Sequence, residues 1–251
     1  TLAARSDCRV TVAVDSEATI AAATGSGAEV LVDVDVGLPR CGCDPHDAAD
    51  LGSRADDAGL RVRGVMGYEG HTVGNPTRQE RAEAVRASME LLQQCRDVVG
   101  GITSAGATGT YDMHPDTDEV QAGSYLLMDT HYQQFQLPFA QAFYVLATVI
   151  SVSPKGWAVA DCGLKSLGMD HGEPSIDGYS VFFCSDEHTT FLPTDGGPDL
   201  PAVGERILVT PAHVDPTVAY HERLQLISAM ADSEPSDHEV LDAWAVDMRG
   251  W

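Results

Sequence analysis

Apolar and polar positions in the first half of the chain follow two different periods, and this pattern predicts strands and helices in turn. Three short apolar or alternating segments are typical of strands, and each is followed by a segment of helical spacing or composition. Repeated units of this kind indicate parallel strands joined by crossover helices. The predicted strands span residues 9–14, 29–36 and 60–66, and the predicted helices span residues 16–24, 45–58 and 76–99.

Two of these helices carry more specific signals. Asp44 followed by Pro45 is typical of a helix start, because an N-cap residue precedes a proline in the first turn. The longest helix has four apolar residues at helical spacing, which predict its buried stripe: Ala82, Val85, Met89 and Leu92.

The second half of the chain has a different pattern. Short strand-like segments are separated by clusters of Gly, Pro and Asp such as residues 193–201, and no long helix is expected between them. The predicted strands span residues 143–152, 157–162, 179–184 and 205–210. This half is therefore predicted to be rich in β-structure.

The number of strand–helix units bears on the fold class. A closed barrel of eight units needs roughly 200 residues or more, whereas two or three units fit before residue 100. The chain also begins at Thr1, shortly before a predicted strand, so we expect it to start inside a domain. We predict an α/β plus β fold. Residues 1–125 form the α/β part and residues 126–251 form a β-rich domain. If the α/β part is a TIM-like (β/α) barrel, its early strands are missing.

Charge and cysteine usage narrow the function classes. The chain has 15 Lys and Arg against 38 Asp and Glu, a net charge of −23, which repels phosphate backbones and anionic lipids. Nucleic acids and membrane surfaces are therefore not expected as partners. The apolar run at residues 143–152 is too short to span a bilayer. There is no secretory signal pattern, and six scattered cysteines fit thiols in a reducing cytoplasm.

A glycine-rich run, "GGITSAGATGT" at residues 100–110, is the first candidate for chemistry. Small residues let backbone N–H groups converge on an anion, and Ser104, Thr108 and Thr110 add hydroxyl donors. The run fits a phosphate group, although it lacks the Lys of a P-loop and the spacing of a dinucleotide-binding motif. The alternative is a flexible glycine-rich turn.

A second candidate is His213 with Asp215 in "TPAHVDPT", directly after a predicted strand. On an extended segment, residues two apart face the same way, so an imidazole nitrogen and a carboxylate oxygen can share one divalent cation. The alternative is a surface histidine beside an unrelated carboxylate.

Two further candidates follow predicted strands, at the end where barrel enzymes build their sites. Arg40 in "VDVGLPRCG" could hold a phenolate or a carboxylate, or it could be a surface residue. In "GVMGYEGH", Tyr68 offers an aromatic face and His71 can titrate near neutral pH. The alternative for this segment is a tight turn with incidental side chains.

The order of these segments together resembles one family. The segments are "VDVDVGLPRCGC", "GVMGYEGHT", "SAGATGTY", "DEVQAGSYLLMD", "ADCGLKSLGMD", "SDEHTTF", "TPAHVDPT" and "AWAVDMRGW". They resemble the D-threonine aldolase and eukaryotic-type D-serine dehydratase family, over nearly the whole chain. The resemblance implies pyridoxal 5'-phosphate as cofactor and an alanine-racemase-like fold, with the active site at the mouth of a TIM-like barrel, against a β domain.

The resemblance also implies roles for individual residues. Arg40 matches the arginine that binds the phenolic oxygen of the cofactor, and Tyr68 matches a tyrosine that lines its ring. His213 and Asp215 match the metal pair, and His71 matches a base on the substrate side. The phosphate-binding loop is matched by Ser104, Gly106, Ala107, Thr108, Gly109 and Thr110.

The H-x-D spacing favours one branch of the family. Dehydratases of the family show a pattern similar to H-x-C, with a cysteine where this chain has Asp215. A carboxylate at position 215 favours Mn²⁺ or Mg²⁺, with Zn²⁺ as an alternative. We therefore predict a metal-dependent lyase that cleaves D-threonine-like D-3-hydroxy-amino acids to glycine and an aldehyde. D-serine dehydratase and D-3-hydroxyaspartate aldolase are the alternatives, and a monomer or homodimer is expected.

The lysines depart from the family pattern. The chain has two, Lys155 and Lys165, and both lie in the β-rich half. The lysine that carries the cofactor in this family belongs to an early barrel strand, so we expect it to precede Thr1. An inactive fragment without that lysine is therefore a further alternative.

Overall fold

The computed structural model describes residues 7–228 and 238–250 of the chain. The chain divides into two compact units, Thr1–Gly123 and Ser124–Trp251. They are called unit 1 and unit 2 below, and each is described by itself.

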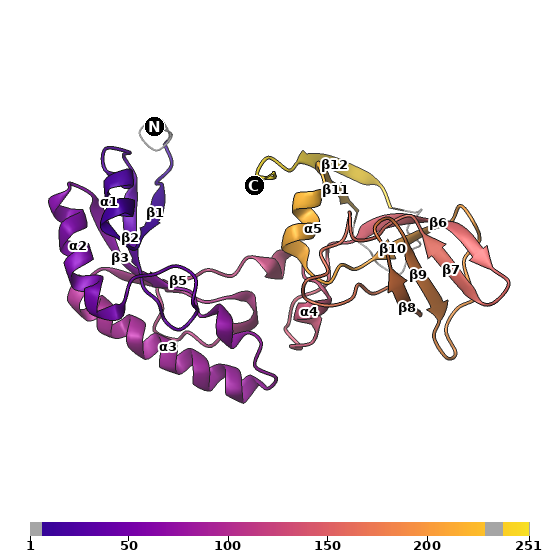
Figure 1. The fold of residues 1–251 in the computed structure, drawn as a ribbon, viewed down its shortest axis with the longest axis horizontal. Helices are drawn as coiled ribbons and strands as arrows, with labels where there is room; N and C mark the ends of the chain where they lie inside the picture. The colour runs from indigo at the N-terminus through magenta and orange to yellow at the C-terminus, as the bar shows by residue number, and fades with distance from the viewer. Residues whose placement is uncertain (1–6, 229–237, 251) are drawn as a thin grey trace. The chain divides into compact units, whose positions relative to one another are not determined.

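Unit 1 contains a five-stranded parallel sheet whose strands are adjacent in chain order (Figure 1). A sheet in which every strand pairs with its successor is wound in one direction only, as in the wall of a (β/α) barrel. The α/β prediction for the first half is confirmed. The strands are β1 (Thr11–Val14), β2 (Glu29–Asp33), β3 (Arg61–Gly67), β4 (Ile102–Ala105) and β5 (Glu119–Val120).

Three helices connect the first four strands: α1 (Glu17–Ala23), α2 (Ala48–Asp57) and α3 (Arg78–Val99). Capping boxes begin α1 at Ser16 and α3 at Thr77, so local side chains satisfy the first backbone N–H groups. As predicted, the Asp44 side chain accepts a hydrogen bond at the next helical start, where a short 3-10 turn precedes α2.

The buried stripe of α3 differs from the predicted one. Val85 and Leu92 are buried as expected, but Ala82 is exposed and Met89 is only half-buried. Ser88 is buried on the stripe although it is polar, because its hydroxyl donates a hydrogen bond to the carbonyl of Val36 at 2.8 Å. The stripe therefore lies one position from the predicted one at its start, and it consists of Arg81, Val85, Ser88, Leu92 and Cys95.

One core joins the helices to the sheet in unit 1. Ile20 of α1, Leu51 of α2 and Leu92 of α3 belong to the same buried cluster as Val32 of β2 and Val65 of β3. Burial of such side chains stabilises the fold by about 1.5–3 kcal/mol each. This core fixes the strand ends from which the candidate residues follow.

Unit 2 is built from antiparallel strands, as the second half of the sequence predicts. Its five-stranded sheet has the order β10-β6-β7-β9-β8, and a separate hairpin pairs β11 with β12 (Figure 1). The sheet strands are β6 (Val145–Ser153), β7 (Trp157–Ala160), β8 (Tyr179–Cys184), β9 (Thr189–Pro193) and β10 (Arg206–Val209). The hairpin strands are β11 (Arg223–Ile227) and β12 (Val240–Ala245), and the short helices are α4 (Thr130–Gln133) and α5 (Val214–Tyr220).

The sequence analysis missed several short strands. In unit 1 these are β4 and β5, and in unit 2 they are β9, β11 and β12. β4 lies inside the glycine-rich run and is made of small, buried residues without an alternating pattern. Within the described residues, no helix is long and apolar enough to cross a membrane.

The reactivity of the cysteine thiols tests whether the two cores are packed as described. Burial raises the pKa of Cys43 and of Cys162 from 9.0 to about 11, whereas Cys41 is exposed. A thiol with a pKa two units higher has about a hundredfold less thiolate at pH 8. We expect a disulfide-exchange reagent at pH 8 to label Cys41 at least a hundredfold faster than Cys43 and Cys162. Peptide mapping by mass spectrometry would measure the three rates, and equal rates in the native protein would contradict this packing.

Candidate functional site

Three of the predicted residues follow β2 and β3 at their carboxyl ends. The guanidinium carbon of Arg40 lies 4.9 Å from the centre of the Tyr68 ring, a cation–π contact. The imidazole of His71 lies against Gly37, where an added Cβ would be 2.7 Å from the ring. Gly37 also has φ +124°, a conformation that L side chains rarely adopt. The structure therefore brings Arg40 and Tyr68 together and places His71 beside the segment after β2.

The glycine-rich loop follows β4 in the same unit. Ser104 belongs to β4 itself, and its hydroxyl accepts a hydrogen bond from the Gln121 side chain at 3.0 Å. The loop proper runs from Gly106 into a short 3-10 turn, Thr108–Thr110, and all of these residues are buried. At Gly106, with φ +97°, a Cβ would lie 3.0 Å from Val120. Only a residue without a side chain fits this bend.

A buried carboxylate, Glu69, holds the loop in this shape. Its side chain is fully buried, and its two oxygens accept hydrogen bonds from the Gly106 N–H at 3.1 Å and the Thr110 hydroxyl at 2.7 Å. The Nε2 atom of His114 lies 3.0 Å from the same carboxylate. Glu69 thus joins the segment after β3 to the loop after β4.

The ionisation of Glu69 follows from these contacts. Burial alone would raise the pKa of its carboxyl, but hydrogen bonds from His114 and Thr110, with the charge of His114, lower the pKa overall. A buried carboxylate that accepts several hydrogen bonds is stable as an anion. The Nδ1 atom of His114 is buried and has no hydrogen-bond partner among the described residues.

Glu69 was missed in the sequence analysis, although it lies between Tyr68 and His71. Its signal is weak, because a glutamate flanked by glycine and tyrosine is typical of an exposed turn. Its burial depends on partners 37 and 41 positions away in the chain.

In unit 2, the structure brings His213 and Asp215 together. The Nε2 atom of His213 lies 3.4 Å from Oδ2 of Asp215. The predicted reason for this approach is wrong, because the segment is not extended. His213 is the N-cap of α5, and Asp215 lies in the first turn of that helix. The extended backbone of His213, at φ −142°, turns its ring toward the side of the first turn that carries Asp215.

Neighbouring segments of unit 2 fix this turn. The His213 N–H donates to the carbonyl of Gly168 at 3.1 Å, and the Thr217 hydroxyl donates to the His213 carbonyl at 2.7 Å. Asp129 is fully buried, and its carboxylate accepts hydrogen bonds from the backbone N–H groups of Val214 and Tyr132, each at 2.9 Å. Asp129 therefore caps both α4 and α5.

Two further side chains, neither of them predicted, contact the His213 ring, and a third lies against one of them. Asp170 lies 2.8 Å from its Nδ1 atom, and His171 stacks on the ring with centroids 3.7 Å apart. His131 lies 4.7 Å from His171, and burial, followed by the charge of His171, lowers the pKa of His131. Burial raises the pKa of the Asp170 carboxyl, but the hydrogen bond from His213, a backbone hydrogen bond and the charges of His213 and His171 together lower the pKa overall.

These donors suit a divalent cation in two possible groupings. His213 and Asp215 offer one nitrogen and one oxygen, the chemistry expected for Mn²⁺, Mg²⁺ or Zn²⁺. The ligand atoms of Asp170, His171 and His213 also lie within 4.8 Å of one another.

The two lysines lie in unit 2. Lys165 is exposed and forms an ion pair with Glu187 at 2.7 Å. Lys155 is exposed in the turn between β6 and β7.

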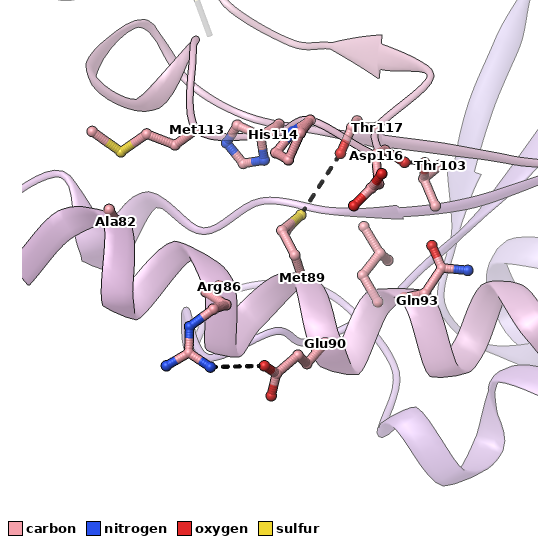
Figure 2. A pocket seen from close by; sticks show the side chains of 12 residues that line it. Ala82, Arg86, Met89, Glu90, Gln93, Thr103, Met113, His114, Asp116 and Thr117 are labelled. Carbon is pink, nitrogen blue, oxygen red and sulfur yellow. Dashed lines mark hydrogen bonds and ion pairs between the residues drawn. The ribbon is translucent and has the colours of Figure 1, made fainter. Parts of the chain in front are cut away.

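A cavity of about 400 Å³ in unit 1 is separate from the candidate residues after β2 and β3. It lies between α3 and the segment after the glycine-rich loop, with Met89 and His114 on opposite walls (Figure 2). The Thr117 hydroxyl donates to the Met89 sulfur across it at 3.9 Å. Its lining includes none of the predicted site residues, and we assign it no ligand.

Comparisons with known proteins identify the family and the fold of the chain. The model described as "Alanine racemase, N-terminal domain" matches residues 2–131, and "Putative serine dehydratase domain" matches residues 142–227. The crystal structure of D-threonine aldolase from Filomicrobium marinum superposes with a TM-score of 0.84 at 30% identity, covering 95% of this chain and 69% of that one. The chain belongs to the D-threonine aldolase and D-serine dehydratase family. Its fold is the alanine-racemase-like fold, which confirms the predicted partial barrel followed by a β-rich part.

Two curated members of this family extend the comparison. D-threonine aldolase from an Arthrobacter species is 32% identical, covering 90% of this chain and 62% of that protein. 3-Hydroxy-D-aspartate aldolase from Paracoccus denitrificans is 28% identical, covering 85% of this chain and 62% of that protein. The chain spans 62% of the length of the curated relatives it matches.

The family implies pyridoxal phosphate, and the residues after β2, β3 and β4 fit it. The loop from Gly106 to Thr110 is made of small, buried residues and bends at Gly106, where a Cβ would meet the side chains of Val120 and His114. The Thr108 hydroxyl is a polar group suited to a phosphate, whereas the Thr110 hydroxyl donates to Glu69. Arg40 and Tyr68 offer a cation and an aromatic face for an anionic ring.

The contacts of Glu69 lead to a prediction on stability. In Glu69→Gln the new NH₂ group meets a backbone N–H or a hydroxyl donor, so a buried donor loses its partner at a cost of about 1–3 kcal/mol. Because the folded-state pKa of Glu69 is below its ordinary value of 4.5, its contribution is complete above that pH and is lost as the pH falls below it. Urea unfolding between pH 3 and 7 should therefore show a smaller loss of stability toward low pH in the variant.

The matched control is Glu83→Gln on the exposed side of α3. We expect it to change the free energy of unfolding by less than about 0.5 kcal/mol. Equal effects of the two variants would show that Glu69 does not hold the loop.

Proposed function

We propose that the protein is a pyridoxal-phosphate- and metal-dependent lyase that cleaves D-threonine-like D-3-hydroxy-amino acids to glycine and an aldehyde. The observation that carries this proposal is the pairing of His213 Nε2 with Asp215 Oδ2 at 3.4 Å. The names of the relatives, D-threonine aldolase and 3-hydroxy-D-aspartate aldolase, support this reaction class. A cytoplasmic location and a monomeric or homodimeric state are part of the same proposal.

Residues of unit 1 would bind the cofactor. Arg40 would donate to the phenolic oxygen, Tyr68 would line the ring, and the loop from Gly106 to Thr110 would hold the phosphate. When bound, pyridoxal phosphate supplies an electron sink for the bond that breaks at the substrate Cα. Glu69 would not contact the cofactor; it would act on cofactor binding through the loop whose shape it maintains.

Residues of unit 2 would act on the substrate hydroxyl. His213 and Asp215 would hold a divalent ion, whose chemistry is to lower the pKa of a bound hydroxyl group. His71 would accept the hydroxyl proton as the Cα–Cβ bond breaks. The oxygen then becomes the carbonyl oxygen of the aldehyde, and a proton added at Cα completes glycine.

The ligand at position 215 favours aldol cleavage over dehydration. A thiolate would favour Zn²⁺, whereas the carboxylate of Asp215 favours Mn²⁺ or Mg²⁺. A D-serine dehydratase would use the same residues but expel the hydroxyl group, giving pyruvate and ammonia. A 3-hydroxyaspartate substrate differs in its side chain and gives glycine with a different aldehyde.

Product analysis tests the reaction. The protein expressed from its whole gene, purified with pyridoxal phosphate and Mn²⁺, should release glycine and acetaldehyde from D-threonine in equal amounts. Chelation of the metal should abolish this activity, and added Mn²⁺ should restore it. Pyruvate from D-serine without glycine release would reject the aldolase proposal, and no turnover of either substrate would favour an inactive form.

Metal binding tests the ligand pair directly. His213→Ala should weaken Mn²⁺ binding at least a hundredfold, because the pair loses its nitrogen ligand. Asp215→Cys should retain a site but shift its preference from Mn²⁺ toward Zn²⁺. Titration of free Mn²⁺ by electron paramagnetic resonance, with competition by Zn²⁺, measures both effects. Asp195→Asn, an exposed acid in another loop of unit 2, is the control for the loss of one negative charge.

A further inference from the structure

The two nitrogens of the His213 ring face different carboxylates. Nδ1 lies 2.9 Å from Oδ1 and 2.8 Å from Oδ2 of Asp170. Nε2 lies 3.4 Å from Oδ2 of Asp215. The ring is therefore between two acids, but at unequal distances.

The two distances indicate two different roles. A separation of 2.8 Å is typical of a charge-assisted hydrogen bond. A separation of 3.4 Å is longer than such a bond. It is close to the spacing of two ligand atoms that each lie about 2.1 Å from one ion, which is about 3.0 Å at an octahedral angle and about 3.4 Å at a tetrahedral angle. Asp170 is thus placed to accept a hydrogen bond from the ring, whereas Asp215 is placed to share a cation with it.

We propose that Asp170 is a positioning residue for the metal centre. Its carboxylate accepts the Nδ1–H group of His213 and so keeps the lone pair of Nε2 available to the ion beside Asp215. A histidine that donates its second N–H to a carboxylate is held in one tautomer and one orientation, and becomes a stronger ligand. This inference deepens the proposed function and rests on its metal pair.

The backbone of the Asp170 segment is fixed to the His213 segment. Gly168 accepts the His213 N–H at 3.1 Å, and the Gly168 N–H donates to the Thr217 hydroxyl at 2.8 Å. A Cβ at Gly168 would lie 2.4 Å from Pro216 and 2.7 Å from the His213 carbonyl oxygen. Only glycine allows this close approach, which brings Asp170 within reach of the ring.

His171 completes the support of the ring. Its imidazole is nearly parallel to that of His213, with an interplanar angle of 16° and centroids 3.7 Å apart. A stacked ring restricts the tilt of its neighbour, whereas the hydrogen bond to Asp170 restricts its rotation. The alternative is that Asp170, His171 and His213 are themselves the ligands of one ion.

Metal affinity without turnover tests the proposal. The probe is Mn²⁺, titrated into the cofactor-loaded protein and its variants, with free Mn²⁺ followed by electron paramagnetic resonance. Asp170→Ala should weaken binding about 10–100-fold, the usual effect of removing an outer partner of a ligating histidine. Asp170→Asn should lose less, because its amide oxygen still accepts the Nδ1–H. Asp195→Asn should bind Mn²⁺ as the unaltered protein does.

The visible spectrum of bound Co²⁺ separates a positioning role from a ligand role. If Asp170 is a positioning residue, the spectrum of Asp170→Asn at saturation has the same bands as that of the unaltered protein. A changed spectrum, with a comparable loss in His171→Asn, would overturn the proposal in favour of the other grouping. Unchanged Mn²⁺ affinity in Asp170→Ala would also overturn it. The Asp170 side chain is 59% exposed, so both variants are expected to fold, which circular dichroism would verify.

The same titrations separate this inference from the proposed function. If the unaltered protein bound no Mn²⁺, or if His213→Ala bound it normally, the metal pair and the role of Asp170 would both be rejected. If His213→Ala lost the metal while Asp170→Ala kept it, only the role of Asp170 would be rejected.

Discussion

The glycine-rich loop and the turn at His213 are each held in place by one fully buried carboxylate. Glu69 accepts the N–H of Gly106 in unit 1, and Asp129 accepts the N–H of Val214 in unit 2. Burying a carboxylate costs several kcal/mol unless hydrogen bonds replace its hydration. Each acid is therefore stable only in the arrangement that brings its donors together. Both loops have a fixed shape before any ligand is present, which lowers the entropic cost of binding.

The parts of the fold that depend on neighbouring residues could be predicted from the sequence. The helix after Asp44 was predicted from an N-cap and a proline, because those signals act within one turn of the backbone. By contrast, β4 was hidden in the glycine-rich run. Its residues are small and buried, so they lack the alternation that marks a half-exposed strand. The stripe of α3 was misplaced in its middle because Ser88, and not Met89, is buried, through a hydrogen bond to a carbonyl 52 positions away.

The candidate residues could be predicted from the sequence, but the residues that hydrogen-bond to them and fix their positions could not. Spacing and chemistry made His213 and Asp215 candidates, and the family resemblance assigned them as the metal pair. Their supports come from distant parts of the chain. Asp170 is 43 positions from His213, and Asp129 is 85 positions from Val214. A single sequence gives no signal for such pairs. The backbone after His213 was also predicted wrongly, since a short helix after a strand has little periodicity of its own.

The position of the metal pair at the start of α5 raises an electrostatic question. Backbone N–H groups in the first turn of a helix carry partial positive charge, which opposes a cation. Here the Val214 N–H is already bonded to the carboxylate of Asp129. Asp170 and Asp215 place two more carboxylates on either side of the His213 ring. The local excess of acid, and not the direction of the helix, therefore sets the sign of the ion that this turn can accept.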